Sequence, residues 1–235
     1  MLIFALIGIA LVTLAHTAPA PVLDALAGER AIWQMPDGPP PTVYLTFDDG
    51  PNPLTTPDLL DVLAREQVKA TFFLIDDHIT SETEEILRRI VAEGHAVGLH
   101  SASRAKMLLT PEQFSQQLTA AADRIARIGG ADPCRVFRPH AGWRGGAMYE
   151  GLRMIDYKLV GWGWMLWDWN WFRARTGDAT YTRIAGRVSA GDIIVMHDGD
   201  ESAPRKDQRH TVEATTRLIP DLRSRGFSFG KVCQD

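Results

Sequence analysis

"TVYLTFDDGPNPLTTPDLLDVLAREQVKATFFLI" occupies residues 42–75 and contains the pattern that repeats along the chain. An apolar run at 42–47 leads through a polar turn into a helical stretch, and a second β-rich run follows at 69–75. Thr56 is expected to cap the helix, with Pro57 in its first turn, where the N–H that proline lacks would be unpaired anyway. The stretch therefore predicts a strand, a helix and a second strand.

The alternation of strand and helix continues to the end of the chain. Further strands are expected at residues 96–100, 135–139, 157–166, 192–197 and 227–232, and further helices at 82–93, 110–130, 146–155, 179–189 and 209–225. Repeated alternation of this kind favours an α/β fold with a parallel sheet. About seven or eight strand–helix units predict a compact (β/α) barrel, complete or incomplete, and a doubly wound open sheet is the alternative.

One helix start carries the pattern of a capping box, in which a side chain at each end of the first turn bonds the backbone of the other. Ser81 and Glu84 predict it in front of the helix at 82–93. Thr110, Pro111 and Gln113 are expected to open the helix at 110–130.

The composition is that of an ordinary globular protein. The chain has 235 residues, of which 45% are hydrophobic and 23% charged, enough for one domain with a sizeable core. A formal net charge of -4 gives no reason to expect nucleic acid or an anionic membrane surface as a partner.

The N-terminus is expected to direct export. Residues 2–15 are almost entirely apolar, which is short for a membrane span and typical of a signal peptide. We therefore expect residues 1–20 to be a signal peptide or an N-terminal membrane anchor, 21–41 a Pro-rich linker and 42–235 the catalytic domain. The protein would then be periplasmic, extracellular or membrane-anchored. The alternative is a buried N-terminal helix of the domain.

The two cysteines, Cys134 and Cys233, lie far apart in the sequence. In an exported chain they could form a disulfide, and otherwise they would be two separate buried thiols. The sequence alone leaves this open.

Ionisable side chains recur at the ends of the expected strands. They are Asp48 and Asp49, His100, Arg138, Asp168 and His197. In parallel α/β folds the functional site collects at the carboxyl ends of the strands. The coincidence of several such positions is the strongest functional indication in the sequence.

Each of these side chains has a structural explanation and a catalytic one. Asp48 and Asp49 fit a polar turn, but neighbours on an extended chain point to opposite sides, so one could bind a metal while the other faces a water molecule. His197 is either a core residue or an acid that protonates a leaving group. Arg138 is either a surface ion-pair residue or the group that keeps a catalytic carboxylate ionised.

Five of the seven tryptophans lie between residues 162 and 171. Trp162 and Trp164 are expected to pack in the core. Trp167, Trp169 and Trp171 are either core residues or a wall on which a sugar ring stacks.

Five motifs occur in a fixed order: "TFDDGP" (46–51), "GLHS" (98–101), "FRPHAG" (137–142), "WDWNW" (167–171) and "IIVMHDG" (193–199). Together they resemble the motifs of the polysaccharide deacetylases, the NodB-homology domain, over roughly residues 42–232. The resemblance implies a distorted (β/α) barrel of seven to eight units. It also implies a hydrolase that removes acetyl groups, usually N-acetyl and alternatively O-acetyl, from a glycan by metal-assisted attack of water.

The resemblance also implies a role for each strand-end residue. The set would be Asp48 as general base, Arg138 as its ion-pair partner, Asp49 and His100 as ligands of a divalent ion, expected to be zinc, His197 as general acid and Asp168 as the carboxylate that tunes it. A backbone N–H near residues 140–142 would stabilise the oxyanion.

The sequence departs from the family pattern at three places. Arg104 stands where the second motif has another histidine, and a guanidinium has no lone pair to give a metal. His140 replaces a proline, and Asn170 stands near Asp168 where the fourth motif has two aspartates. Catalytic zinc usually has three protein ligands. His140 could supply the third, water or substrate could complete a two-ligand site, or no metal binds and Arg104 holds a substrate carboxylate.

Three functions are therefore carried forward. The first is a secreted, metal-dependent glycan deacetylase acting on peptidoglycan, a chitin-like polymer, xylan or a capsule. The second is a non-catalytic glycan-binding relative. The third is a metal-independent hydrolase of another non-peptide C–N amide bond.

Overall fold

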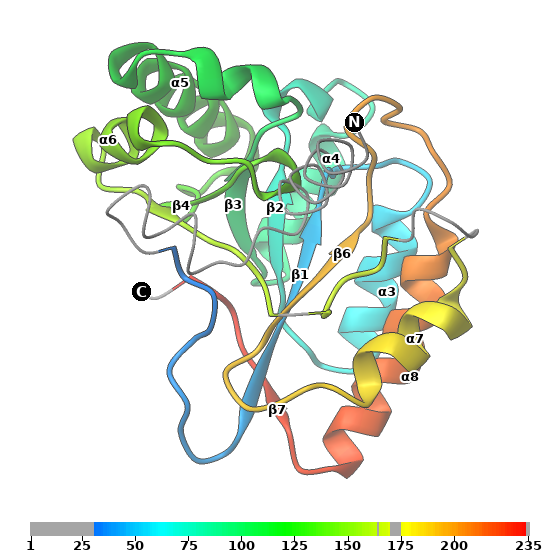
Figure 1. Ribbon diagram of the computed structural model, residues 1–235. Helices are drawn as coiled ribbons and strands as arrows, with labels where there is room; N and C mark the ends of the chain where they lie inside the picture. The colour runs from blue at the N-terminus through cyan, green and yellow to red at the C-terminus, as the bar shows by residue number, and fades with distance from the viewer. Residues whose placement is uncertain (1–30, 164, 170–174, 234–235) are drawn as a thin grey trace, which may run out of the picture.

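The computed structural model describes residues 31–163, 165–169 and 175–233. Within this part of the chain, seven strands form a parallel sheet in the order β5-β4-β3-β2-β1-β6, with β7 paired to β1 (Figure 1). The strands are β1 (Thr42–Asp48), β2 (Thr71–Leu74), β3 (Ala96–His100), β4 (Val136–Arg138), β5 (Lys158–Leu159), β6 (Ile193–His197) and β7 (Ser228–Phe229). Each of these pairings is parallel, as the alternating sequence predicts.

The two edge strands of the sheet, β5 and β6, are connected by the chain that follows β5. Gly163 N donates to the carbonyl of Ile193 at 2.9 Å, and Val195 N donates to the carbonyl of Leu166 at 2.9 Å. The sheet therefore curls into a distorted (β/α) barrel, and the alternative of a doubly wound open sheet is wrong.

The strand expected over residues 157–166 forms only at Lys158–Leu159. Beyond it, Gly161 N donates to the carbonyl of Ile32 at 2.8 Å. The ring of Trp33 lies so close that a Cβ on Gly161 would be 2.2 Å from it. The N-terminal segment thus takes the place of a neighbouring strand here, and the chain continues irregularly along the barrel wall.

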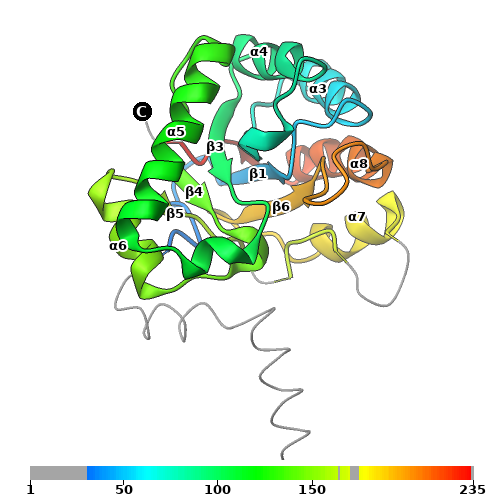
Figure 2. The ribbon, with the colours of Figure 1, turned by 90° about the horizontal axis from the view of Figure 1, so that it is seen from above.

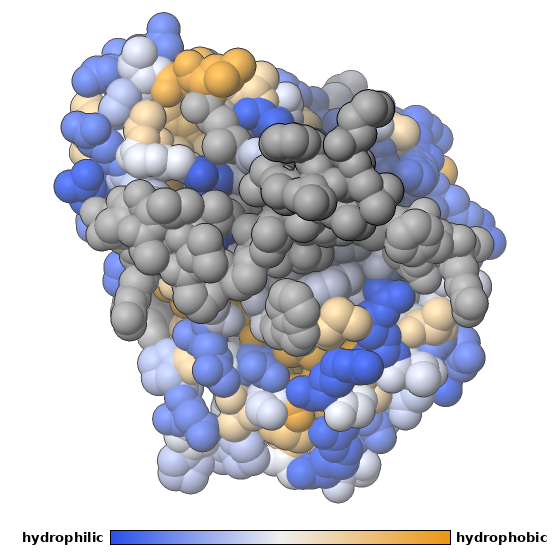
Figure 3. Space-filling model, viewed as in Figure 1, coloured by the Kyte–Doolittle hydropathy of each residue, from blue (hydrophilic) through white to orange (hydrophobic). Residues whose placement is uncertain are grey.

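The helices surround the strands, as the view from above shows (Figure 2). They are α3 (Thr56–Arg65), α4 (Glu84–Ala92), α5 (Pro111–Gly129), α6 (Gly146–Met154), α7 (Gly177–Ala185) and α8 (Arg209–Ser224), with short 3-10 helices η1 (Asp76–His78), η2 (Arg104–Leu108) and η3 (His140–Gly142). Hydrophilic residues dominate the rim of the visible face (Figure 3), as expected for helices that bury one side against a barrel. In the described part of the chain, none of the helices has the length and apolar character needed to cross a membrane.

The predicted capping box of Ser81 and Glu84 is wrong, because α4 begins at Glu84 behind Thr83. The Thr83 hydroxyl donates to the carbonyl of His78 at 2.6 Å, so it anchors η1 instead. A capping box forms at the start of α5, between Thr110 and Gln113, where the sequence predicted the helix start alone.

The expected linker also needs a correction. Residues 31–35 are part of the folded domain, because Ala31 and Met35 are buried and Met35 N donates to the carbonyl of Gly191 at 2.8 Å. The expected signal or anchor segment at 1–20 lies outside the described residues.

Cys134 and Cys233 form a disulfide, with their Cα atoms 5.7 Å apart. It joins the tail that follows β7 to the chain that enters β4. Of the two alternatives for these cysteines, paired and separate, the structure has the first.

Reducing this disulfide, or replacing both cysteines by serine, should lower the free energy of unfolding by about 4 kcal/mol. The reason is that a cross-link spanning 99 residues restricts the unfolded chain far more than the folded one. Urea titrations with and without reductant measure the difference, and equal midpoints would contradict the expectation.

Candidate active site

The register of the sheet brings the ionisable strand ends together. Asp48 on β1 pairs with His197 on β6, and His100 on β3 pairs with Arg138 on β4. Because the strands are parallel, their carboxyl ends open into one pocket of about 290 Å³. Its lining residues are Asp48, Asp49, His100, Arg104, Pro139, His140, Ala141, Trp162, Trp169, Arg175, His197, Asp200, Glu201 and Lys206.

Arg138 is fully buried behind Asp48. Its Nη1 donates to Asp48 Oδ1 at 2.6 Å and to Thr46 Oγ1 at 2.7 Å, and its Nη2 donates to the carbonyl of Gly161 at 2.9 Å. A charge-assisted bond of this length holds the Asp48 carboxylate in one orientation. Arg138 therefore acts on the pocket through Asp48 and has no place in its lining.

The guanidinium of Arg138 also stacks on Phe73, with its Cζ atom 4.0 Å from the ring centroid. This ring requires the glycine on the neighbouring strand, since a Cβ on Gly98 would be 2.7 Å from it. Gly98 of the "GLHS" motif thus leaves space for the Phe73 ring on which the Arg138 guanidinium stacks.

Asp49 and His100 face each other beside this ion pair. Asp49 Oδ1 lies 3.1 Å from His100 Nε2, and both side chains are buried. The contact lacks hydrogen-bond geometry, so Oδ1 accepts no hydrogen bond from the described residues. Burial raises the pKa of Asp49, but contact with His100 outweighs it and lowers the pKa to about 2. The backbone of Asp49 has φ 68° and is anchored by His78, whose Nδ1 lies 2.9 Å from the Asp49 carbonyl.

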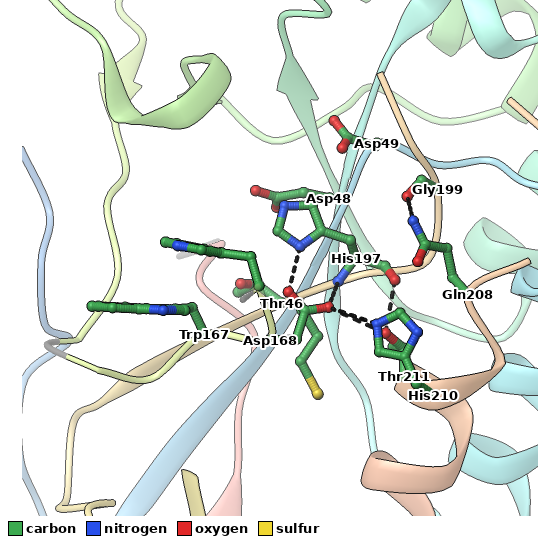
Figure 4. A network of polar contacts seen from close by, with 12 residues as sticks. Thr46, Asp48, Asp49, Trp167, Asp168, His197, Gly199, Gln208, His210 and Thr211 are labelled. Atoms are coloured by element: carbon green, nitrogen blue, oxygen red, sulfur yellow. Dashed lines mark hydrogen bonds and ion pairs between the residues drawn. The ribbon is translucent and has the colours of Figure 1, made fainter. Parts of the chain in front are cut away.

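His197 is oriented by a buried carboxylate. Its Nδ1 donates to Asp168 Oδ1 at 2.6 Å, and its backbone N–H donates to Asp168 Oδ2 at 2.8 Å (Figure 4). Burial lowers the pKa of His197, but Asp168 outweighs it and raises the pKa to about 9. Since Nδ1 is engaged, Nε2 is the nitrogen left for the pocket, and it carries a proton at neutral pH. Asp168 forms this pair although Asn170 stands near it where the fourth motif of the family has two aspartates.

The side chains present fall one ligand short of a catalytic metal site. Asp49 and His100 have the donor atoms and the burial that a divalent ion requires, and the unbonded Asp49 Oδ1 fits such a role. Within the described residues, however, no group of three His, Cys, Asp or Glu side chains could hold a metal ion. Catalytic zinc normally has three protein ligands, so the described set does not fit it.

Arg104 and His140, the two unusual motif residues, both line the pocket. Arg104 is exposed, and its Cζ lies 5.4 Å from the ring centroid of Trp143. Burial and the neighbouring His100 lower the pKa of His140, and Arg104 adds to this effect. The Ser101 hydroxyl accepts the backbone N–H of His140 at 2.9 Å and so fixes this loop to the end of β3.

The tryptophans are distributed differently from the sequence expectation. Trp162, expected in the core, lines the pocket together with Trp169. Trp167 is buried beneath Trp169, with parallel rings 4.8 Å apart, and does not line the pocket. Trp164 and Trp171 lie outside the described residues. The two rings that face the pocket, Trp162 and Trp169, meet edge to face at 5.4 Å.

Sequence reasoning missed several residues that hold the site. Thr46 could have been identified from the sequence, because it lies two positions before Asp48 and therefore on the same face of β1. No sequence pattern indicated Thr211, whose hydroxyl donates to the carbonyl of His197 at 2.8 Å. Arg175, Asp200, Glu201 and Lys206 enter the pocket from loops whose course the sequence did not predict.

The fold and the site define a class: a (β/α) barrel whose pocket holds a carboxylate paired with a buried arginine and an imidazole oriented by a buried carboxylate. A sequence profile described as polysaccharide deacetylase matches residues 36–160. The chain is 36% identical over 197 residues to a chitooligosaccharide deacetylase of Sinorhizobium fredii, covering 80% of this chain and 88% of the relative. The chain belongs to the polysaccharide deacetylase family.

Two further comparisons agree. A peptidoglycan-N-acetylglucosamine deacetylase of Bacillus cereus is 26% identical over 203 residues, covering 86% of this chain and 91% of that protein. A family 4 acetyl xylan esterase from Clostridium thermocellum, solved with a cobalt ion, superimposes with a TM-score of 0.71 and 31% identity, covering 81% of this chain and 88% of that one.

Replacing Arg138 by methionine should lower the free energy of unfolding by about 3–5 kcal/mol, because it leaves the Asp48 carboxylate buried without its partner. Adding Asp48→Asn to this variant should recover part of the loss, since the uncompensated charge is then removed. A double-mutant cycle in urea measures both effects. A double variant no more stable than Arg138→Met would contradict the assignment of the cost to the unpaired charge.

Proposed function

We propose that this protein hydrolyses acetamide groups on a glycan, releasing acetate and leaving a free amine on the sugar. The observation that carries the proposal is the pairing of Asp48 with His197 on adjacent strands, each supported from behind by a buried partner of opposite charge. This provides an acceptor and a donor of protons on one pocket.

In the proposed reaction, Asp48 takes a proton from a water molecule while the oxygen of that water attacks the acetyl carbonyl carbon. The tetrahedral intermediate then breaks its C–N bond. His197 gives its Nε2 proton to the departing sugar nitrogen, which leaves as an amine. The acetyl carbon leaves as acetate, so one water is consumed for each acetyl group removed.

The amide of Ala141 is the proposed donor to the oxyanion. His140 N donates to Ser101 and Gly142 N donates to the carbonyl of Pro139, so these two amides are already engaged. Ala141 lies between them in the pocket wall, with φ 51°. An N–H held in this way needs no reorganisation when the charge develops.

Asp49 and His100 are the proposed ligands of a divalent ion, with zinc as the expected metal. His140 is the candidate for the third position, although as the described side chains stand it does not complete a group of three with them. Two observations support His140 as this candidate: it lines the same pocket, and it contributes to the lowered pKa of Asp49. The incomplete ligand set is also the one observation that favours the alternative, a metal-independent amide hydrolase.

The proposed substrate is a cell-wall or related polysaccharide. The similar proteins from Sinorhizobium fredii and Bacillus cereus are named for chitooligosaccharide and for peptidoglycan N-acetylglucosamine. Trp162 and Trp169 offer flat apolar surfaces with a polar N–H, which suits a sugar ring. Arg104 would hold a carboxylate on that sugar, since a guanidinium stacked on an aromatic face keeps its N–H donors at the ring edge.

The proposed location is outside the cytoplasm, either free or anchored at the N-terminus. The disulfide supports this proposal, because such bonds persist in oxidising compartments. The apolar stretch at residues 2–15 supports it independently.

Acetate release from chitooligosaccharides and from peptidoglycan fragments tests the function. Asp48→Asn should reduce the rate at least a thousandfold while thermal unfolding stays cooperative, because the amide accepts no proton from water. Asp156→Asn, which changes a side chain that is 84% exposed, is the matched control and should keep the full rate. Unchanged acetate release by Asp48→Asn would refute the assigned base. Retained glycan binding without acetate release by the wild type would favour the non-catalytic relative.

Metal analysis of the wild type beside Arg104→His and His140→Ala tests the ligand set. Arg104→His should bind zinc at least tenfold more tightly than the wild type, because it adds a neutral imidazole to the two proposed ligands and removes a positive charge. His140→Ala should weaken the binding that the wild type has. A wild type that holds one zinc per chain with no loss in His140→Ala would show that the third ligand lies elsewhere.

A further inference from the structure

A second imidazole lies against the carboxylate that orients the proposed acid. His210, in the first turn of α8, places its Nε2 3.6 Å from Asp168 Oδ2 (Figure 4). The His210 side chain is only 10% exposed, and its Nε2 is buried with no hydrogen-bond partner among the described residues, the carboxylate of Asp168 at 3.6 Å being the nearest recorded acceptor. A buried polar nitrogen is costly unless it is paired, so the carboxylate is its natural partner.

Asp168 Oδ2 has room for this donor. The oxygen accepts the backbone N–H of His197 at 2.8 Å. Thr211 Oγ1 lies 3.3 Å from it but 2.8 Å from the His197 carbonyl, and its single proton belongs to the nearer acceptor. A carboxylate oxygen has two lone-pair directions, and one of them is thus open to His210.

We propose that His210 is a positioning residue for His197: its Nε2–H group holds Oδ2 of Asp168, so that the two imidazoles share one carboxylate. The inference rests on the proposed function for the role of His197 as acid. It goes beyond that function because His210 touches neither the pocket lining nor the reacting atoms.

Sharing the carboxylate has a chemical consequence. A hydrogen bond from His210 makes the Asp168 carboxylate a weaker acceptor for the Nδ1–H group of His197. The pKa of His197 is then lower, so the imidazolium gives its Nε2 proton more readily. The charges around Asp168 act in the same sense: burial raises the pKa of this carboxylate, but His197, His210 and Arg175 lower it. Asp168, Asp49 and Asp48 in turn raise the pKa of His197 to about 9 against its burial. An acid with a pKa nearer to the working pH is the better catalyst.

The test compares His210→Leu, which removes the donor, with His210→Gln, whose amide can donate from nearly the same position. His210→Leu should lower kcat about tenfold with KM unchanged, and His210→Gln should recover most of it. The loss of rate at alkaline pH, expected near pH 9 in the wild type, should move upward by roughly half a unit in His210→Leu. Thr216→Ala, which changes an exposed hydroxyl on the same helix, is the control and should match the wild type.

Nitrogen NMR of the histidines gives a readout that does not need activity. It should show a proton on Nε2 of His210 and a higher pKa of His197 in His210→Leu than in the wild type. A His210 with its proton on Nδ1, or an unchanged or lower pKa of His197 in His210→Leu, would overturn the proposal. If these NMR results hold while acetate release is absent, the positioning role stands and the proposed function fails. If His210→Leu does not fold, the tautomer in the wild type still decides.

Discussion

A buried guanidinium is the constraint on which the rest of the site depends. Burying a charge is unfavourable unless it is paired and its donors are satisfied. The two terminal nitrogens of Arg138 find partners only on other segments: the carboxylate of Asp48, the hydroxyl of Thr46 and the carbonyl of Gly161. Its Nε is buried without a hydrogen bond to the described residues, so the pairing with Asp48 carries most of the compensation. Strands β1 and β4 and the chain after β5 must therefore keep their positions for the arginine to be tolerated. The same requirement fixes the carboxylate of Asp48, the proposed base.

The side of the pocket that carries His197, the proposed acid, is built on the same principle with the charges reversed. Here the buried group is the Asp168 carboxylate, and the imidazole that it orients faces the pocket. In both cases a fully buried partner controls a pocket-lining side chain through bonds of 2.6 Å. The pocket itself is left for water, the acetyl group and the sugar. Two of the three departures from the family pattern, Arg104 and His140, lie in this lining and leave both ion pairs intact, and the third, Asn170, lies outside the described residues.

The sequence predicted the parts of the fold that follow from local chemistry. Apolar runs bounded by turn residues located the strands β1, β2, β3, β4 and β6, and Thr110, Pro111 and Gln113 located the start of α5. It failed where a distant segment competes with the local preference. Thr83 displaced the cap expected from Ser81 because its hydroxyl bonds the carbonyl of His78.

The tryptophans show the same limit within the site. A run of aromatic residues near a strand end indicates a large apolar surface. Whether each ring is buried in the core or faces the pocket depends on which other segments pack against it. Trp167 lies under Trp169, and Trp162 turns to the pocket beside it. Alternation along the chain alone had suggested the reverse for Trp162.

By itself, the sequence determined which chemical groups stand at the strand ends and in what order, because strand, turn and helix preferences act over a few residues. Only the tertiary structure decided which of these groups become partners. Arg138 and Asp48 are 90 residues apart, and His197 and Asp168 are 29 apart. Contacts over such separations depend on the register of the parallel sheet and on the path of the returning helices, because these bring distant segments within bonding distance.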